Sequence, residues 1–264
     1  MNYAIILSGG IGTRMQMGDF PKQYLEVEKK PILLYTLEQF QKSSAVEKIV
    51  IVAADAWREK IRGWMEEDGI TKFLAFADAG DTRQESIHNG LTVCMEDSVS
   101  ENDGVIIHDG VRPFVEERSI DGCIDSLDQF NAATVAYAST DTILLTEDLG
   151  DRKVVKSVPE RPNTFRAQTP QAFRFGTIVK AYELAAADPD FHPTDDTRVV
   201  VDYLPDEPVA IVDGSETNLK ITTPSDMPIA EGIARSLDPE HAKEEATARM
   251  HAVFAEAFSQ MHSR

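Results

Sequence analysis

Short apolar runs alternate along the chain with segments whose apolar residues recur at helical spacing. The runs cover residues 3–7, 48–54, 73–79, 104–110 and 132–138, mostly bounded by Gly, Asp or Asn. The helical spacing covers residues 31–42, 55–68, 82–97 and 117–130. Runs of this length predict buried strands, and their alternation with helices predicts a parallel sheet. The sequence therefore predicts an α/β fold: a Rossmann-like open, mostly parallel sheet with helices on both faces.

The chain of 264 residues, 42% of them hydrophobic, can bury a core as one large domain with a small appendage. A further strand is expected at 208–214 and a last core helix within 223–237. We expect the main domain to span residues 1–237 and a C-terminal amphipathic helical tail to span 238–264. The apolar residues of the tail at helical spacing are Met250, Val253, Phe254, Phe258 and Met261.

Residues 139–168 break the alternation of strands and helices. TDTILLTEDLGDRKVVKSVPERP reads as two extended segments around an LGD turn, with no helix to cover them. Apolar residues on two faces of such an arm need a partner surface. We therefore predict a protruding β-arm that joins two copies of the chain in a homodimer, with a plain edge hairpin as the alternative.

Charge and cysteine content exclude several classes of function. The formal net charge of −19 argues against binding to nucleic-acid polymers, which requires cationic patches. No apolar run reaches the length of a membrane span and no signal peptide is recognisable, so we expect a cytoplasmic protein without membrane partners. Cys94 and Cys123 lie far apart within predicted helices, which favours two buried thiols over a disulfide or zinc site.

The first predicted strand leads into a glycine loop, SGGIGTRM, followed by PKQYL. A Walker A loop would need a terminal Gly-Lys-Ser/Thr, and a dinucleotide fingerprint would need a third glycine at Met15. What remains is a loop whose N–H groups can face phosphate oxygens, with Arg14 projecting from it and Lys22 held behind a proline. The combination predicts a triphosphate clamp, and a tight turn with solvated charges is the alternative.

The chain resembles a known enzyme family over about residues 3–235. The motifs that carry the resemblance are, in order, GGIGTRM, PKQYL, GDTRQES, HDGVRPF, TDTI, AQTPQAF, TDDTRVVV and NLKITTPSD. They are similar to those of the cytidylyltransferases that act on 2-C-methyl-D-erythritol 4-phosphate and on ribitol 5-phosphate. The resemblance implies a nucleotidyltransferase domain in which a polyol phosphate attacks the α-phosphorus of CTP and releases pyrophosphate.

The resemblance also implies roles for residues in the nucleotide site. The catalytic cations would be Arg14, Lys22 and Lys220, with Gly9, Gly10 and Gly12 around the phosphates. The base and ribose would contact Gly80, Asp81, Arg83, Ser86 and Asp109. Asp109 would also bind Mg²⁺, which needs only one or two carboxylates beside phosphate oxygens.

Some of these residues have plainer interpretations. Asp81 also precedes a predicted helix as an N-cap candidate. His108 is better explained as a packed histidine than as a catalytic base. Gly110 stands where the family often has Ala, and this small change should be tolerated.

For the polyol phosphate, the resemblance implies Asp109 and Arg112 together with Thr142 and Arg161, the last two from the arm of the neighbouring subunit. Pro162 departs from many relatives. The phrase VRPF, and the absence of Leu-Trp before QTP, favour ribitol 5-phosphate over 2-C-methyl-D-erythritol 4-phosphate. Two distant alternatives are an NAD-dependent dehydrogenase, which Asp55 would serve, and a non-catalytic nucleotide-binding protein.

Overall fold

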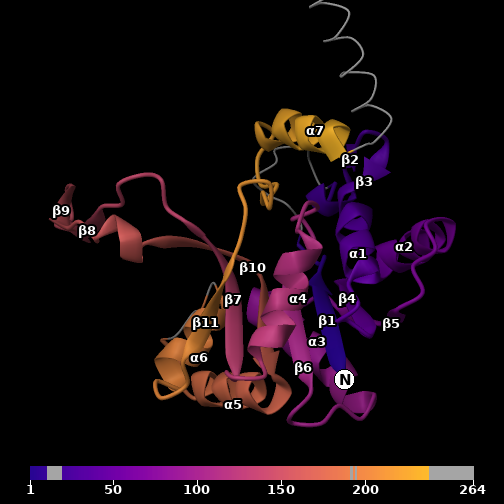
Figure 1. The fold of residues 1–264 in the computed structure, drawn as a ribbon, viewed down its shortest axis with the longest axis horizontal. Helices are drawn as coiled ribbons and strands as arrows, with labels where there is room; N and C mark the ends of the chain where they lie inside the picture. Colours follow the sequence, from indigo (N-terminus) through magenta and orange to yellow (C-terminus); the bar gives the residue numbers. More distant parts are fainter. Residues whose placement is uncertain (11–19, 191–192, 194, 238–264) are drawn as a thin grey trace, which may run out of the picture.

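A seven-stranded sheet in the order β11-β7-β10-β6-β1-β4-β5 forms the centre of the protein (Figure 1). The computed structural model describes residues 1–10, 20–190, 193 and 195–237. The strands are β1 (Asn2–Leu7), β4 (Lys48–Ala53), β5 (Phe73–Asp78), β6 (Gly104–Asp109), β7 (Ala132–Ala138), β10 (Phe165–Arg174) and β11 (Val209–Asp213). All neighbouring strands are parallel except that β10 runs antiparallel to both β6 and β7. The predicted mostly parallel α/β sheet is confirmed.

Helices cover both faces of this sheet. Their bounds are α1 (Ile32–Lys42), α2 (Asp55–Glu67), α3 (Arg83–Glu96), α4 (Glu117–Ser126), α5 (Phe175–Ala186), α6 (Asp196–Tyr203) and α7 (Asp226–Leu237). Alternate residues of β1 enter opposite layers: Ala4 and Ile6 pack with α1, α2 and α4, while Tyr3 and Ile5 pack with α3, α5 and α6. The buried interiors of β1 and β4 are therefore apolar on both faces, because neither face meets water.

The carboxyl edge of the sheet is covered by a third, smaller cluster. Helix α7 lies across this edge beside the short strands β2 (Glu26–Val27) and β3 (Lys30–Pro31) (Figure 1). Its Ala230 packs with Ile221 and Phe114. This cover leaves open the place where β1, β5 and β6 end.

The predicted arm is present as an extended hairpin that projects from the sheet (Figure 1). Strands β8 (Leu145–Asp148) and β9 (Lys153–Ser157) pair antiparallel in a sheet of their own, and all their residues are exposed. The predicted boundary at 168 was wrong, because it cuts through β10. This strand begins on the arm at Phe165 and ends between β6 and β7.

Neither the insertion of β10 nor helices α5 and α6 were predicted from the sequence. Both cysteines are buried and unpaired, as expected. No helix among the described residues is long and apolar enough to cross a bilayer. The expected tail at 238–264 lies outside the described residues.

Two helical glycines differ in how closely they approach the sheet, and this gives a test of the packing. A Cβ on Gly90 of α3 would lie 2.6 Å from Ile5 Cγ2, whereas nothing lies within 4 Å of one on Gly63 of α2. Gly90→Ala should therefore lower the free energy of unfolding by about 1–3 kcal/mol through overpacking. Gly63→Ala should raise it by about 0.5–1 kcal/mol, because alanine favours the helix.

Chemical denaturation of the two variants beside the wild type measures both effects. Stabilisation by both substitutions would contradict the close contact between α3 and β1.

Candidate active site

A cavity of about 440 Å³ opens at the carboxyl edge of the sheet. Strand β1 leads into Gly9, β5 leads into Gly80, and β6 ends at Asp109. The predicted residues that line this one cavity are Gly9, Gly10, Lys22, Gly80, Asp81, Arg83, Ser86, Asp109 and Lys220. Gly12 and Arg14 lie outside the described residues. Segments as far apart in the sequence as Gly9 and Lys220 thus converge where parallel strands end, as ligand sites of such sheets do.

The start of the glycine loop is held by close contacts on both sides. A Cβ on Gly9 would lie 2.5 Å from the Cβ of Ala79, so only glycine fits against the segment that follows β5. On the other side, Gln23 Nε2 donates to the carbonyl oxygens of Ser8 at 2.6 Å and Gly10 at 2.9 Å. These contacts fix the loop against two walls of the cavity.

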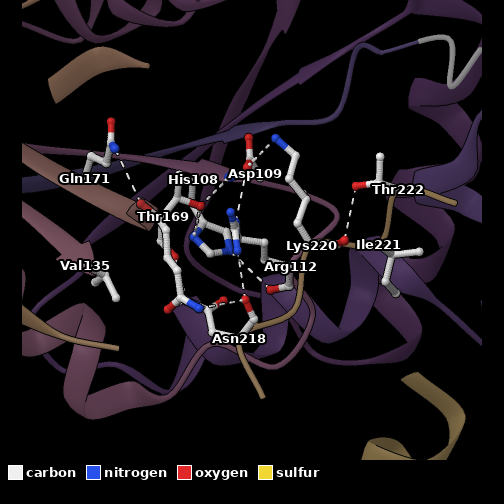
Figure 2. Close-up of polar contacts among 12 residues, drawn as sticks. His108, Asp109, Arg112, Val135, Thr169, Gln171, Asn218, Lys220, Ile221 and Thr222 are labelled. Carbon is white, nitrogen blue, oxygen red and sulfur yellow. Dashed lines mark hydrogen bonds and ion pairs between the residues drawn. The ribbon is translucent and has the colours of Figure 1, made fainter. Parts of the chain in front are cut away.

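Lys22 and Lys220, the two described lysines that line the cavity, meet at residues 220–221. Lys22, in the 3-10 turn η2 (Lys22–Tyr24), is buried, and its Nζ donates to the carbonyl oxygen of Ile221 at 3.0 Å. The neighbouring Lys220 places its Nζ 2.9 Å from Asp109 Oδ2 (Figure 2). Basic side chains thus concentrate here in a strongly acidic protein, as binding of a small polyanion requires.

Asp109 is an ionised carboxylate. Burial alone would raise its pKa, but Lys220, Arg112 and Arg83 together hold the pKa well below its ordinary value. Oδ2 faces both Lys220 and Arg112, the latter through Nε at 3.3 Å. Among the described residues, the ion pairs of this carboxylate are made by Oδ2.

Arg112 lies behind Asp109 and does not line the cavity. It is buried, and its Nη1 donates to the carbonyl oxygen of Asn218 at 2.8 Å (Figure 2). Two of its nitrogens therefore hold Asp109 and the segment that leads to Lys220. Direct contact of Arg112 with a substrate stays a prediction.

His108 is a packed, hydrogen-bonded histidine, as preferred from the sequence. Its Nε2 lies 3.2 Å from the carbonyl oxygen of Arg112, which can only accept, so Nε2 carries the proton. Nδ1 then accepts from the hydroxyl of Thr169 at 3.0 Å, and that hydroxyl accepts the N–H of Asp109 at 3.1 Å. The ring is fully buried, which lowers its pKa to about 3. His108 is therefore neutral and orients the end of β6.

The two predicted arm residues meet each other outside the cavity of their own chain. Arg161, in the 3-10 turn η3 (Arg161–Asn163), donates from Nη2 to Thr142 Oγ1 at 3.2 Å. Both residues are exposed, and neither lines the cavity. The structure brings them together with each other but not with Asp109.

The model of one protein family, described as 2-C-methyl-D-erythritol 4-phosphate cytidylyltransferase (IspD), matches residues 2–236 of the chain. This chain belongs to the IspD family. It is 58% identical to the 2-C-methyl-D-erythritol 4-phosphate cytidylyltransferase of Bifidobacterium longum subsp. infantis, over 98% of this chain and 89% of that protein. It is 35% identical to the ribitol-5-phosphate cytidylyltransferase of Vibrio parahaemolyticus, over 88% and 95%.

Solved structures agree with this assignment. The 4-diphosphocytidyl-2C-methyl-D-erythritol synthase of Anaerococcus prevotii matches with a TM-score of 0.75 at 29% identity, covering 89% of this chain and 96% of that one. The predicted family is confirmed, and the protein is a nucleotidyltransferase of the cytidylyltransferase type.

Sequence reasoning missed several residues that shape the site of this IspD protein. Asp81 is not the cap of α3: the N-cap is Thr82, whose hydroxyl accepts the N–H of Glu85 at 3.1 Å. The spacing of Thr82 and Glu85 is that of a capping box, which could have revealed this cap. Gln23 and Thr169 were quoted within motifs without a role.

Glycine at position 110 allows the ends of β1 and β6 to approach closely. A Cβ there would lie 2.9 Å from the carbonyl oxygen of Leu7, so the ends of β1 and β6 would have to shift apart.

Buried His108 makes stability depend on pH. The unfolded state takes up a proton near pH 6.5 and the folded state only near pH 3, so the folded form loses stability as pH falls through this interval. Between pH 7 and pH 5 the loss should reach about 2 kcal/mol of unfolding free energy. His108→Gln should lack this component, and denaturant titrations at both pH values measure it.

Asp109 does not interfere with this comparison, because its depressed pKa reduces stability only as pH falls below about 5. Equal losses in the wild type and in His108→Gln would contradict a neutral, buried histidine.

Proposed function

We propose that this protein transfers the cytidylyl group of CTP to 2-C-methyl-D-erythritol 4-phosphate, giving a CDP-alcohol and pyrophosphate. The main support for this proposal is that Lys22, Lys220 and Asp109 line the same cavity as the glycine loop and the segment after β5. This arrangement suits a nucleoside triphosphate whose phosphates face the lysines.

The comparisons support this choice of the second substrate. Identity is 58% to a protein named for 2-C-methyl-D-erythritol 4-phosphate and 35% to one named for ribitol 5-phosphate. These values support the alternative of the sequence analysis better than the ribitol phosphate that it favoured. Parts of its cues lie away from the cavity: Phe114 packs in the cluster under α7, and residues 165–167 are exposed on the arm side of β10. Phe114 and residues 165–167 are therefore poor indicators of the substrate.

In the proposed reaction a phosphate oxygen of the polyol phosphate forms a bond to the α-phosphorus of CTP. The bond from that phosphorus to the bridging oxygen breaks, and pyrophosphate leaves with the electron pair. A phosphate monoester is mostly dianionic near neutral pH, so the attacking oxygen carries no proton that must be removed. A site without a general base is sufficient, which accords with a neutral His108 sealed behind Arg112 and Thr169.

The residues of the chain then act by positioning and by charge. Lys22 and Lys220 stabilise the negative charge that grows on the α-phosphate and on the leaving pyrophosphate. Backbone N–H groups of the glycine loop orient the phosphates. Gly12 and Arg14 belong to the same proposed clamp, although they lie outside the described residues.

Asp109 fits a magnesium ion as a single protein ligand. The described residues contain no cluster of three or more His, Cys, Asp or Glu side chains that could hold a metal alone. The ionised Oδ1 of Asp109 is a hard oxygen, and Mg²⁺ usually completes such a site with phosphate oxygens and water. A bound Mg²⁺ would neutralise charge on the phosphates of CTP.

The arm supports a proposal of a homodimer with shared sites. Leu144, Leu145, Leu149, Val155 and Val158 are large apolar side chains on the arm that are exposed in the single chain. Thr142 and Arg161 lie on the same arm, where an arginine fork can hold a phosphate that is bound in the cavity of a second subunit.

The substrate assignment is tested by release of pyrophosphate from CTP and Mg²⁺ with each polyol phosphate. We expect kcat/KM for 2-C-methyl-D-erythritol 4-phosphate to exceed that for ribitol 5-phosphate by about 100-fold or more, because polar groups built for one polyol remain unpaired with the other. The reverse preference would restore the ribitol assignment.

Three controls belong to this assay. Replacement of CTP by ATP and addition of excess chelator should each abolish most of the activity. Inactivity with both polyol phosphates would refute the proposed function.

Mixing two impaired variants, assayed at a low concentration of the polyol phosphate, tests the shared site. Lys22→Ala should lower kcat by about 100-fold or more, because it removes one preorganised cation. Arg161→Ala should raise KM for the polyol phosphate and spare CTP. In a mixed dimer one site carries both defects and the other neither, so an equal mixture should regain about a quarter of wild-type activity.

Subunit exchange is verified by isolating the mixed dimer with two different affinity tags. A mixed dimer as inactive as its parents would show that Arg161 serves its own subunit or only the arm.

A further inference from the structure

Two sequence motifs, AQTPQ and TDDTR, meet beside the nucleotide cavity although the chemistry above gives them no role. They supply Gln171 near the end of β10 and Asp196 at the start of α6, and both side chains are fully buried. A carboxylate that is withdrawn from water must be paired closely. The residue that pairs with Asp196 therefore indicates the role of the TDDTR motif.

The partner of Asp196 is Arg83, which lines the cavity from the first position of α3. Arg83 Nη1 lies 2.7 Å from Asp196 Oδ1, and Nη2 lies 2.5 Å from Oδ2. This is a bidentate ion pair, whose two parallel hydrogen bonds fix the orientation of the guanidinium. The hydroxyl of Tyr182 also donates to Oδ1.

This bidentate ion pair determines what Arg83 presents to a ligand. Burial would lower the pKa of Arg83, but the Asp196 carboxylate raises it above its ordinary value, so the guanidinium stays charged and paired. Both terminal nitrogens point at Asp196. Arg83 therefore faces the cavity as a fixed wall beside Gly80 and Ser86, whereas Lys22 and Lys220 present charge.

Asp196 is itself anchored to β10. Gln171 Oε1 accepts the N–H groups of Asp196 at 3.1 Å and Thr197 at 3.2 Å. Gln171 Nε2 donates to Asp195 Oδ2 at 2.7 Å. Two residues earlier on the same strand, Thr169 orients Asp109, and Figure 2 shows both side chains. One strand thus holds two walls of the cavity.

Docking of α6 does not by itself explain the ion pair. Val199 and Val200 of α6 are fully buried in the apolar layer that also contains residues of α3 and α5. An apolar pair at positions 83 and 196 would pack the helices without the desolvation cost of two charges.

We propose that Asp196 is a positioning residue that locks Arg83 as a wall of the nucleobase pocket and thereby favours a pyrimidine over a larger purine. This inference rests on the proposed use of CTP. The lock acts through geometry, because a guanidinium held by two hydrogen bonds cannot swing aside to enlarge the pocket.

Asp196→Asn tests the lock. The amide can no longer accept from both guanidinium nitrogens, so KM for CTP should rise by about tenfold while kcat and KM for the polyol phosphate change less than about twofold. The ratio of kcat/KM for CTP to that for ATP should fall by about tenfold. Asp202→Asn is the matched control, because Asp202 pairs with Arg198 on the same helix and should leave all these values unchanged.

A double mutant separates the lock from a merely structural role. In an Arg83→Met background, adding Asp196→Asn should change KM for CTP by less than about twofold, since the residue to be positioned is already absent. Independent effects of the two substitutions would overturn the proposal, as would an unchanged KM for CTP in a folded Asp196→Asn protein.

Tyr182→Phe decides the question if Asp196→Asn does not fold, because it removes only the hydroxyl that donates to Asp196. A rise of about threefold in KM for CTP is expected, and no rise would overturn the lock. A wild-type protein that cannot use CTP would instead refute the proposed function.

Discussion

The buried carboxylate of Asp109 organises the carboxyl edge of the sheet. Withdrawing a charge from water is costly unless it is closely paired, and here Lys220 and Arg112 come to one of its oxygens. Arg112 also binds the carbonyl oxygen of Asn218, and the Thr169 hydroxyl accepts the Asp109 N–H. The contacts of Asp109 and Arg112 therefore fix β6, β10 and the segment before α7 relative to one another. These contacts hold the segments around the cavity in place.

Much of this architecture was predictable because the signals are local. Strands that are buried on both faces must be apolar throughout, and helices that cover them must be apolar on one side. These patterns predicted β1, β4, β5, β6 and β7 and the helices between them within about two residues, apart from the later end expected for α4. Lys22 could be found because a cation after a glycine loop is already unusual in so acidic a chain.

The remaining features depend on contacts between distant segments. Nothing near Arg83 indicates that its partner is Asp196, and nothing in the sequence of β10 indicates that it enters the sheet antiparallel. Nothing near Arg112 in the sequence indicates that its nitrogens contact Asp109 and Asn218. Phe114 looked like a substrate cue but packs beneath α7, because neighbours along the chain can face a ligand or the core.

The tip of the arm, β8 and β9, is a separate two-stranded sheet, whereas its base, β10, belongs to the central sheet. The length and sequence of β8 and β9 can therefore change without altering the register of the central sheet. Strand β10 allows no such freedom, since insertion of one residue would turn Thr169 and Gln171 to the opposite face. Variation among relatives should therefore concentrate in the hairpin tip. A protein engineer could therefore replace the tip without changing the fold of the central sheet.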